Sequence, residues 1–329
     1  MKLLQKIHNR AYNFYRLNIV CEQYPMLTSI SRKECQDRGA WGVVYMLHHI
    51  TSKNPKGIPT NEDLKVSPEF LEKIILKYKK EGFEFVSLEG LSEIIISEKK
   101  PEHPFVSFTI DDGFLDNYTN ALPVFEQHQV PFAIFIATDF IDKKAILWWD
   151  ILEDLILDNN TIHIGDTDYC CRTFQEKWDL FRILREKILC LDQIRIEDAL
   201  KRMFANYNID WFEPVRRQAM SWEHVKEISQ HQLCTIGGHT VSHLALSQLN
   251  EEDLRREVSE CISKLQATIG KPISHFAYPY GSPNEIGERE YHLISEFNFK
   301  TAFIAYGGCI TEDNKTNITH LPRVYLHEQ

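Results

Sequence analysis

Two short stretches of the sequence carry residue types that could do chemistry together. Residues 105–114 read FVSFTIDDGF, an apolar run that ends in two adjacent carboxylates and a glycine. Residues 237–243 read GGHTVSH and place His239 and His243 four positions apart. On a helical turn, that spacing lets two imidazoles face one cation at about 2.0–2.1 Å. The two stretches together predict a divalent-metal site that needs one further ligand.

The adjacent carboxylates Asp111 and Asp112 cannot play the same part at such a site. Successive side chains on a strand point to opposite sides, and two like charges at close range raise the pKa of one of them. One carboxylate can therefore bind a metal while its neighbour serves as a base. An ordinary turn would explain either stretch alone, but the occurrence of both at the ends of β-like runs favours the functional interpretation.

These stretches, with a third one, resemble the motifs of the polysaccharide deacetylases, also called carbohydrate esterase family four. The family's T-F-D-D-G motif is similar to residues 109–113 (TIDDG), and its H-[ST]-x-x-H motif is matched by residues 239–243 (HTVSH). A third family motif ends in P-[YW]-G after a strand and resembles residues 276–281 (FAYPYG). The resemblance runs from about Trp41 to Arg323 and is interrupted by a long middle segment.

The resemblance implies a role for each matching residue. Asp111 is implied to be the general base. The implied ligands of a divalent metal, most often zinc, are Asp112, His239 and His243. A metal with three protein ligands and an open position lowers the pKa of its water and polarises an amide carbonyl. The backbone N–H of Tyr280 corresponds to the family's donor to the oxyanion.

Two departures from the family pattern concern the base and the acid. Family members with the fullest third motif carry an arginine two residues before the proline, where this chain has Ala277. We expect Arg323 to orient Asp111 instead, because a planar guanidinium suits a carboxylate; a surface arginine at a strand start is the alternative. The family also uses a late histidine that protonates the leaving amine. The candidates for that histidine, none of them a clean match, are His327, His320 and His275.

Further residues near these motifs are expected to contact a substrate. Residues 41–50 form an apolar run that ends in two histidines, and His49 reaches the rim of Asp112 if the run is a buried strand. A strand-end histidine with a structural role is the alternative. Trp148 could stack on a sugar ring, although paired tryptophans more often anchor an insertion to its host domain. The expected substrate-binding residues are His49, Tyr278, Pro279 and Trp148.

Helix-like and strand-like segments alternate around these motifs. A serine cap, a proline and a terminal glycine frame an expected helix from Ser67 to Gly82. Residues 131–137 have the unbroken apolar character of a fully buried strand. Other expected elements are strands at 83–86, 232–236, 273–278 and 301–305 and helices at 122–125 and 251–269. This order, with the family, predicts an α/β fold, an incomplete or distorted TIM-like (β/α) barrel.

Two segments fall outside this alternation. Residues from about 146 to 219 are helix-rich and are predicted to form a helical insertion in a deacetylase barrel that spans 38–329. Residues 1–37 are predicted to form a helical N-terminal extension. Its apolar stripe from Leu3 to Phe14 is expected to pack on protein, with peripheral membrane contact as the minor alternative.

Composition sets limits on the class of protein. The chain has 329 residues, of which 43% are hydrophobic, enough for a packed core. A net charge of −10 argues against a nucleic-acid-binding surface. The eight cysteines lack a C-x-x-C pair and predict free thiols in a reducing compartment. The sequence shows neither a signal-peptide core nor an apolar run of ~18 residues, which predicts a cytoplasmic protein without a transmembrane segment.

The sequence therefore predicts a cytoplasmic, metal-dependent hydrolase with a glycan or glycan-precursor substrate. The expected reaction removes an N-acetyl group from an amino sugar in a polysaccharide, an oligosaccharide or a lipid- or nucleotide-linked precursor of cell-envelope polysaccharide. One alternative is a non-catalytic descendant that binds metal or glycan, which the missing arginine and late histidine favour and the retained Asp111 opposes. A sugar deformylase is the other alternative.

Overall fold

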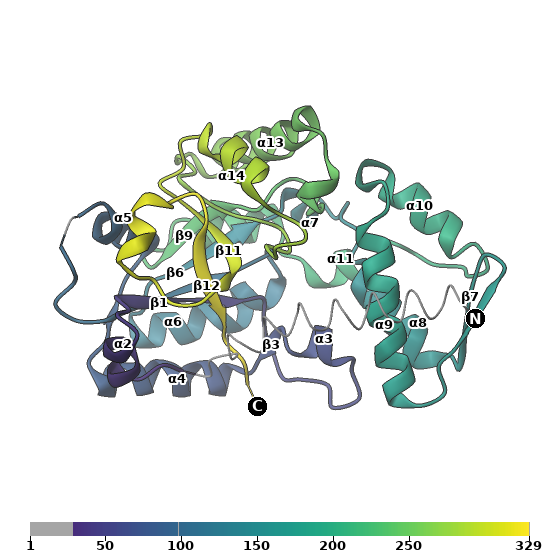
Figure 1. Ribbon diagram of the computed structural model, residues 1–329, viewed down its shortest axis with the longest axis horizontal. Helices are drawn as coiled ribbons and strands as arrows, with labels where there is room; N and C mark the ends of the chain where they lie inside the picture. Colours follow the sequence, from purple (N-terminus) through teal and green to yellow (C-terminus); the bar gives the residue numbers. More distant parts are fainter. Residues whose placement is uncertain (1–28, 98, 329) are drawn as a thin grey trace.

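The structure, a computed structural model, describes residues 29–97 and 99–328 (Figure 1). Most of the predicted N-terminal extension, including its apolar stripe, lies outside the described residues. The described part holds helix α2 (Arg32–Asp37), whose cap Ser31 and third residue Glu34 bond each other's backbone. Within the described ranges, every helix is too short or too polar to cross a membrane.

Seven parallel strands form a closed ring. In chain order they are β1 (Gly42–Leu47), β5 (Phe105–Ile110), β6 (Phe132–Ile136), β9 (Cys234–Gly238), β10 (His275–Ala277), β11 (Thr301–Gly307) and β12 (Leu321–Tyr325). Each strand pairs with the next, and β1 closes the ring because it pairs with both β5 and β12. Strand β4 (Glu84–Phe85) pairs with the start of β5 as an addition to the ring. The predicted distorted TIM-like barrel is confirmed.

The inside of the ring is filled by alternate residues of the strands. One hydrophobic cluster joins side chains from six strands and three from helix α5 (Leu88–Ile96). The strand residues in it include Val44, Phe105, Phe135, Ala277, Phe303 and Leu321. Because side chains alternate along a strand, the positions two and four residues after these also point inward. This alternation determines which residues can reach a site at the carboxyl end of the ring.

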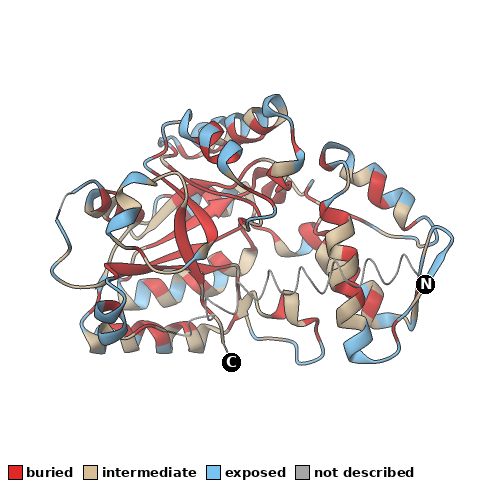
Figure 2. Cartoon of the chain, in the orientation of Figure 1, coloured by how far each residue is buried: buried red, intermediate tan, exposed pale blue. Residues whose placement is uncertain are grey.

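Helices cover the outside of the barrel, where Figure 2 shows buried strands surrounded by half-exposed helices. Helix α4 (Pro68–Glu81) begins after the cap Ser67 and ends at the left-handed Gly82, as predicted. The other covering helices are α6 (Leu122–His128), α12 (Trp222–Ile228), α13 (Glu251–Ile269) and α14 (Glu288–Ser295). Shorter elements are β2 (His49–Ile50), α3 (Pro59–Glu62), β3 (Lys65–Val66), a π-helical turn (Asn117–Ala121), α7 (Thr138–Ile141) and 3₁₀ turns at Leu246–Gln248 and Glu312–Thr316.

The middle segment lies beside the barrel, at the right in Figure 1. It contains α8 (Trp148–Asp158), α9 (Phe174–Leu189), a 3₁₀ turn (Gln193–Arg195), α10 (Ile196–Met203) and α11 (Glu213–Gln218). It also holds an antiparallel hairpin of β7 (Thr161–Ile164) and β8 (Thr167–Cys170), an element that the helical prediction missed. A second hydrophobic cluster, with Trp148, Phe181 and Trp211 among its members, gives this segment a core of its own.

Candidate active site

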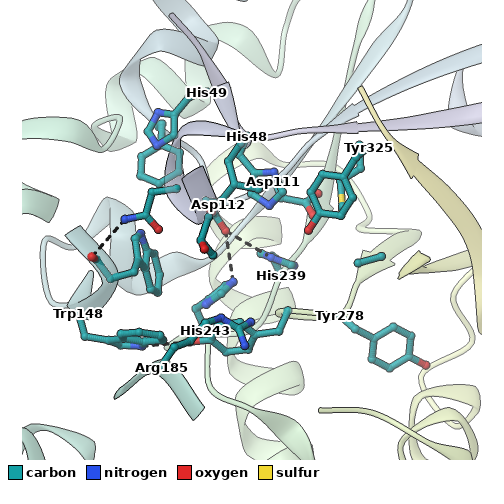
Figure 3. Close-up of a pocket in the computed structure, with 18 of the residues that line it drawn as sticks. His48, His49, Asp111, Asp112, Trp148, Arg185, His239, His243, Tyr278 and Tyr325 are labelled. Atoms are coloured by element: carbon teal, nitrogen blue, oxygen red, sulfur yellow. Dashed lines mark hydrogen bonds and ion pairs between the residues drawn. The ribbon is translucent and has the colours of Figure 1, made fainter. Parts of the chain in front are cut away.

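The predicted site residues gather at the carboxyl ends of the strands. Asp111 and Asp112 follow β5, and His239 directly follows β9. They line one cavity together with His243 and Tyr280 (Figure 3), the usual place for a site in a barrel of parallel strands. The cavity has a volume of about 790 Å³, its open mouth included, and residues of the middle segment form part of its wall.

Three buried side chains form a candidate metal centre. Oδ1 of Asp112 lies 3.4 Å from Nε2 of His239 and 3.4 Å from Nε2 of His243. This oxygen is buried and makes no hydrogen bond, which is unusual for a buried carboxylate. The donor atoms of the three residues lie within 4.8 Å of one another. One carboxylate and two imidazoles around an unsatisfied oxygen suit a divalent cation such as zinc.

A backbone contact fixes the orientation of His239. Its Nδ1 donates a hydrogen bond of 2.7 Å to the carbonyl oxygen of Ala277, so Nε2 presents its lone pair to Asp112. Ala277 stands where the family pattern has arginine, but this hydrogen bond is accepted by its backbone carbonyl and does not depend on the side chain. Burial lowers the pKa of His243 to about 4, which keeps its imidazole neutral and able to bind a metal.

Residues 239–243 form a loop, so the helical turn expected there is wrong. Thr240 and His243 have positive φ of 68° and 56°, and the hydroxyl of Thr240 accepts the backbone N–H of His243 at 3.1 Å. Glu257, from α13, accepts the N–H groups of Val241 and Ser242 at 3.1 and 2.8 Å. The two imidazoles therefore converge through a braced loop instead of through helical periodicity.

Arg323 holds Asp111 through two hydrogen bonds, as the sequence predicts. Nη1 and Nη2 of the guanidinium donate to the two carboxylate oxygens, each at 2.7 Å. The guanidinium also donates to Thr109 Oγ1 and to the carbonyl of Ile304, both at 3.0 Å. Burial disfavours the charge of Asp111, but Arg323 lowers the pKa of its carboxyl below the ordinary value. The carboxylate therefore stays ionised and fixed in place.

Two tight turns of the same rare type bound the site. Gly113 N–H donates to Asp111 O at 3.0 Å across Asp112, whose φ is +79°. Gly281 N–H donates to the carbonyl of Pro279 at 2.6 Å across Tyr280, whose φ is +58°. Such γ-turns are strained and concentrate at functional sites. The N–H of Tyr280 has no acceptor among the described residues and is available to an oxyanion.

His48, which was not predicted as a site residue, lines the cavity beside Asp111 and Asp112 (Figure 3). Its Nδ1 is buried without a hydrogen-bond partner, and burial lowers the pKa of its imidazole. Leu47 of β1 lies opposite Ile110 of β5, so the residues that follow them, His48 and Asp111, are neighbours. A prediction that pairs these two strands in this register would have found His48.

His49 also lines the cavity, at a distance from the metal centre (Figure 3). Its Nδ1 lies 2.8 Å from Oδ2 of Asp116, and its ring stacks on Phe114 with centroids 3.8 Å apart. Trp148 lines the cavity while its Nε1 donates to the hydroxyl of Tyr280 at 3.2 Å. Trp148 also belongs to the core of the middle segment, which agrees with the anchoring role; its stacking on a sugar ring stays a prediction.

Other predicted residues are less involved in the cavity. Tyr278 lines it, but its hydroxyl donates to the carbonyl of Thr319 at 2.8 Å, away from the metal centre (Figure 3). Pro279 is buried and is not among the lining residues that the structure describes.

The three late candidates for a proton donor lie outside the described lining of the cavity. His275 begins β10, at the opposite end of the strand, and contacts Thr301. His320 stacks on Tyr291 with centroids 4.4 Å apart. His327 has its Nδ1 3.6 Å from Oδ1 of Asp63. His275 and His320 lie at the amino ends of β10 and β12, away from the cavity, whereas His327 follows β12 and is directed to Asp63.

Comparisons with known proteins agree with this geometry. A family model described as polysaccharide deacetylase matches residues 98–182 and 192–293, more than half of the chain. The curated protein "Putative polysaccharide deacetylase YxkH" of Bacillus subtilis (strain 168) is 28% identical over 126 residues, 38% of this chain and 42% of that protein. The match therefore spans less than half the length of that relative.

Solved structures share the fold. The Streptococcus pyogenes deacetylase PplD, in complex with acetate, aligns with a TM-score of 0.58 and 16% identity over 87% of this chain and 92% of its own. IcaB from Ammonifex degensii aligns with a TM-score of 0.54 and 18% identity over 87% of this chain and 92% of its own. At such identities the likeness concerns the arrangement of the chain alone.

Proposed function

Since the chain belongs to the polysaccharide deacetylase family, we propose that it is a metal-dependent hydrolase that removes an N-acetyl group from an amino sugar of a glycan or glycan precursor. The observation that carries the proposal is the meeting of two units at one cavity. One unit is the buried triad of Asp112, His239 and His243, and the other is Asp111 with its guanidinium partner Arg323. A non-catalytic descendant would have no need of the second unit.

The triad would hold the metal, and we propose Zn²⁺ for this set of donors. Zn²⁺ supplies Lewis acidity and a water of lowered pKa when it is bound. The Nε2 lone pair of His239 is already directed to the site, because Nδ1 donates to Ala277.

Asp111 is the proposed general base. Its carboxylate is ionised because of Arg323, and each oxygen keeps a second lone pair beyond its bond to the guanidinium. It would accept the proton of the attacking water, a contribution of typically 10²–10⁴-fold for a positioned base. Tyr280 would donate its backbone N–H to the oxygen that gains charge as the acetyl carbon is attacked.

His48 is the proposed carrier of a proton to the leaving amine. The amine cannot leave as an anion, so the proton that Asp111 takes up has to be returned on the leaving-group side. His48 lines the same cavity and is close enough to both carboxylates for their charges to oppose the fall in its pKa. None of the three late histidines has this position.

Acetate release from a defined panel tests the proposal. Metal-loaded protein is incubated with N-acetylated monosaccharides, oligosaccharides and lipid-linked sugars, and both acetate and formate are measured. We expect acetate from at least one glycan, lost on chelation and in Asp111→Asn and restored by Zn²⁺ in the unmodified protein. Formate as the product from the matching N-formyl sugars would favour the deformylase alternative, and release of neither acid would favour the non-catalytic one.

A further inference from the structure

The middle segment contributes a charged side chain to the cavity. Phe181 and Arg185 are four residues apart on α9, so they share one face of the helix, and both line the cavity. Figure 3 shows Arg185 close to His243 and Trp148. Among the lining residues that the structure describes, Arg185 alone carries a fixed positive charge; the other arginine of the site, Arg323, is bonded to Asp111 and is not part of that lining.

The two arginines differ in how their hydrogen-bond donors are used. Arg323 is fully buried and gives its guanidinium to Asp111, Thr109 and Ile304. Arg185 makes one described hydrogen bond, from Nη1 to Oε1 of the adjacent Glu186 at 2.9 Å. Nε and Nη2 of Arg185 donate to no acceptor among the described residues.

The bond to Glu186 does not neutralise Arg185. Neighbouring residues on a helix do not face each other, and side-chain exposures of 27% and 35% leave the pair in contact with water. Pairs of this kind contribute little because water screens the two charges. An anionic ligand that enters the cavity can therefore displace Glu186 from the guanidinium with little loss of free energy.

The charge of Arg185 acts on the reaction side of the cavity. Tyr280 lines the same cavity, and its ring centroid lies 4.7 Å from that of His243, beside which Figure 3 shows Arg185. Glu285 lies within reach of the same charge: burial raises its pKa, and Ser282 and Arg185 oppose the rise. Arg185 is therefore close to the residue whose backbone N–H is the proposed oxyanion donor.

We propose that Arg185 binds an anionic substituent of the substrate, a phosphate or a carboxylate carried by the glycan near the N-acetyl group. The proposal rests on the proposed function, because it concerns the same cavity. A guanidinium presents a planar fork that matches either anion, and Nε and Nη2 of Arg185 have no acceptor among the described residues. The insertion would thus select charged glycan precursors over neutral chains.

Binding of three probes to the metal-loaded full chain tests this inference by calorimetry. The probes are methyl N-acetylglucosaminide, which is neutral, N-acetylglucosamine 1-phosphate and N-acetylmuramic acid. We expect at least one charged probe to bind about tenfold more tightly than the neutral one, as a charge-assisted hydrogen bond predicts. The stronger of the two charged probes identifies phosphate or carboxylate as the anion.

Variants assign the preference to Arg185. Arg185→Gln should remove the preference for the charged probe, and Glu186→Gln should increase it a few-fold because a competing carboxylate is gone. Arg182→Gln is the matched control on the same helix; its side chain pairs with Asp179 and lies over Trp178, and the preference should be unchanged.

Equal affinities for all three probes, or a preference that survives in Arg185→Gln, would overturn the proposal. The preference is a binding measurement, and acetate release from the same probes is followed separately. A preference that depends on Arg185 without acetate release contradicts only the proposed hydrolysis.

Discussion

Arg323, on β12, and Asp111, at the end of β5, share two hydrogen bonds of 2.7 Å although 212 positions separate them in the sequence. Both side chains point to the inside of the barrel, because Arg323 and Asp111 follow the interior residues Leu321 and Phe105 by an even number of positions. The pair replaces an arginine that the family pattern places at Ala277. A base can thus be oriented from a different strand of the same barrel.

Arg323→Lys should lower turnover and move the acidic limb of the pH–rate profile to higher pH. Asp111 has its pKa lowered in the folded protein, and the guanidinium lowers it. Without that contact the pKa of Asp111 rises, so the carboxylate protonates, and activity is lost, at a higher pH than in the unmodified protein. A rate loss at all pH values with an unmoved acidic limb would contradict this role.

Arg323→Ala should destabilise the fold by about 3–5 kcal/mol, the usual cost of leaving one member of a buried ion pair without its partner. Chemical denaturation at neutral pH measures the change. Arg217→Ala, which removes one member of an exposed pair with Glu213, is the control and should change the free energy of unfolding by less than about 1 kcal/mol.

His239→Ala should lose most of the bound metal, because one of three ligands is removed and its Nε2 cannot be replaced. Metal content of the purified, dialysed protein is the measurement. His231→Ala, on a partly exposed histidine 3.5 Å from Glu126, is the control and should keep full stoichiometry. Full metal content in both variants would exclude the proposed ligand set.

Glu257→Ala should weaken metal binding by about 10–100-fold without removing a ligand. The variant loses the acceptor of the Val241 and Ser242 N–H groups, which brace the loop between the two histidines. Competition with a chelator of known affinity measures the change. Glu260→Ala, exposed on the same helix, should bind metal as the unmodified protein does, and equal affinities of the two variants would show that the brace has no effect.

His48→Gln should slow deacetylation of an N-acetyl sugar by about 10²–10⁴-fold, the range for a positioned acid or base. The loss should be much smaller for 4-nitrophenyl acetate, whose leaving group departs without a proton. His49→Gln, at an expected sugar contact in the cavity wall, should in contrast raise KM for the sugar and leave kcat for both substrates within a few-fold. Equal losses for the two substrates in His48→Gln would show that this residue does not deliver the proton.

The motifs at the ends of β5 and β9 could be predicted from the sequence because each follows an apolar strand directly. Asp111, Asp112, His239 and His243 meet for that reason. His49 was predicted and His48 was not, although both line the cavity, because the register of β1 against β5 decides which of two adjacent histidines stands beside Asp111.

The part of the middle segment in the cavity wall could not be predicted. Helical spacing on α9 indicates that Phe181 and Arg185 share a face, but it does not say which neighbouring element that face meets. The conformation of residues 239–243 could not be predicted either, because it depends on hydrogen bonds to Glu257, which is distant in the sequence. The cytoplasmic location stays a prediction.

The pairing of β1 with β12 determines when the barrel can close as the chain is synthesised. Tyr45 lies beside Val324, so the ring joins strands from the two ends of the described chain, and such non-local contacts form slowly. During synthesis, the metal-binding side chains leave the ribosome well before Arg323 does. We therefore expect a nascent chain to acquire metal donors first and an oriented base only when the ring closes. Activity would then report completed assembly, whereas metal content would not.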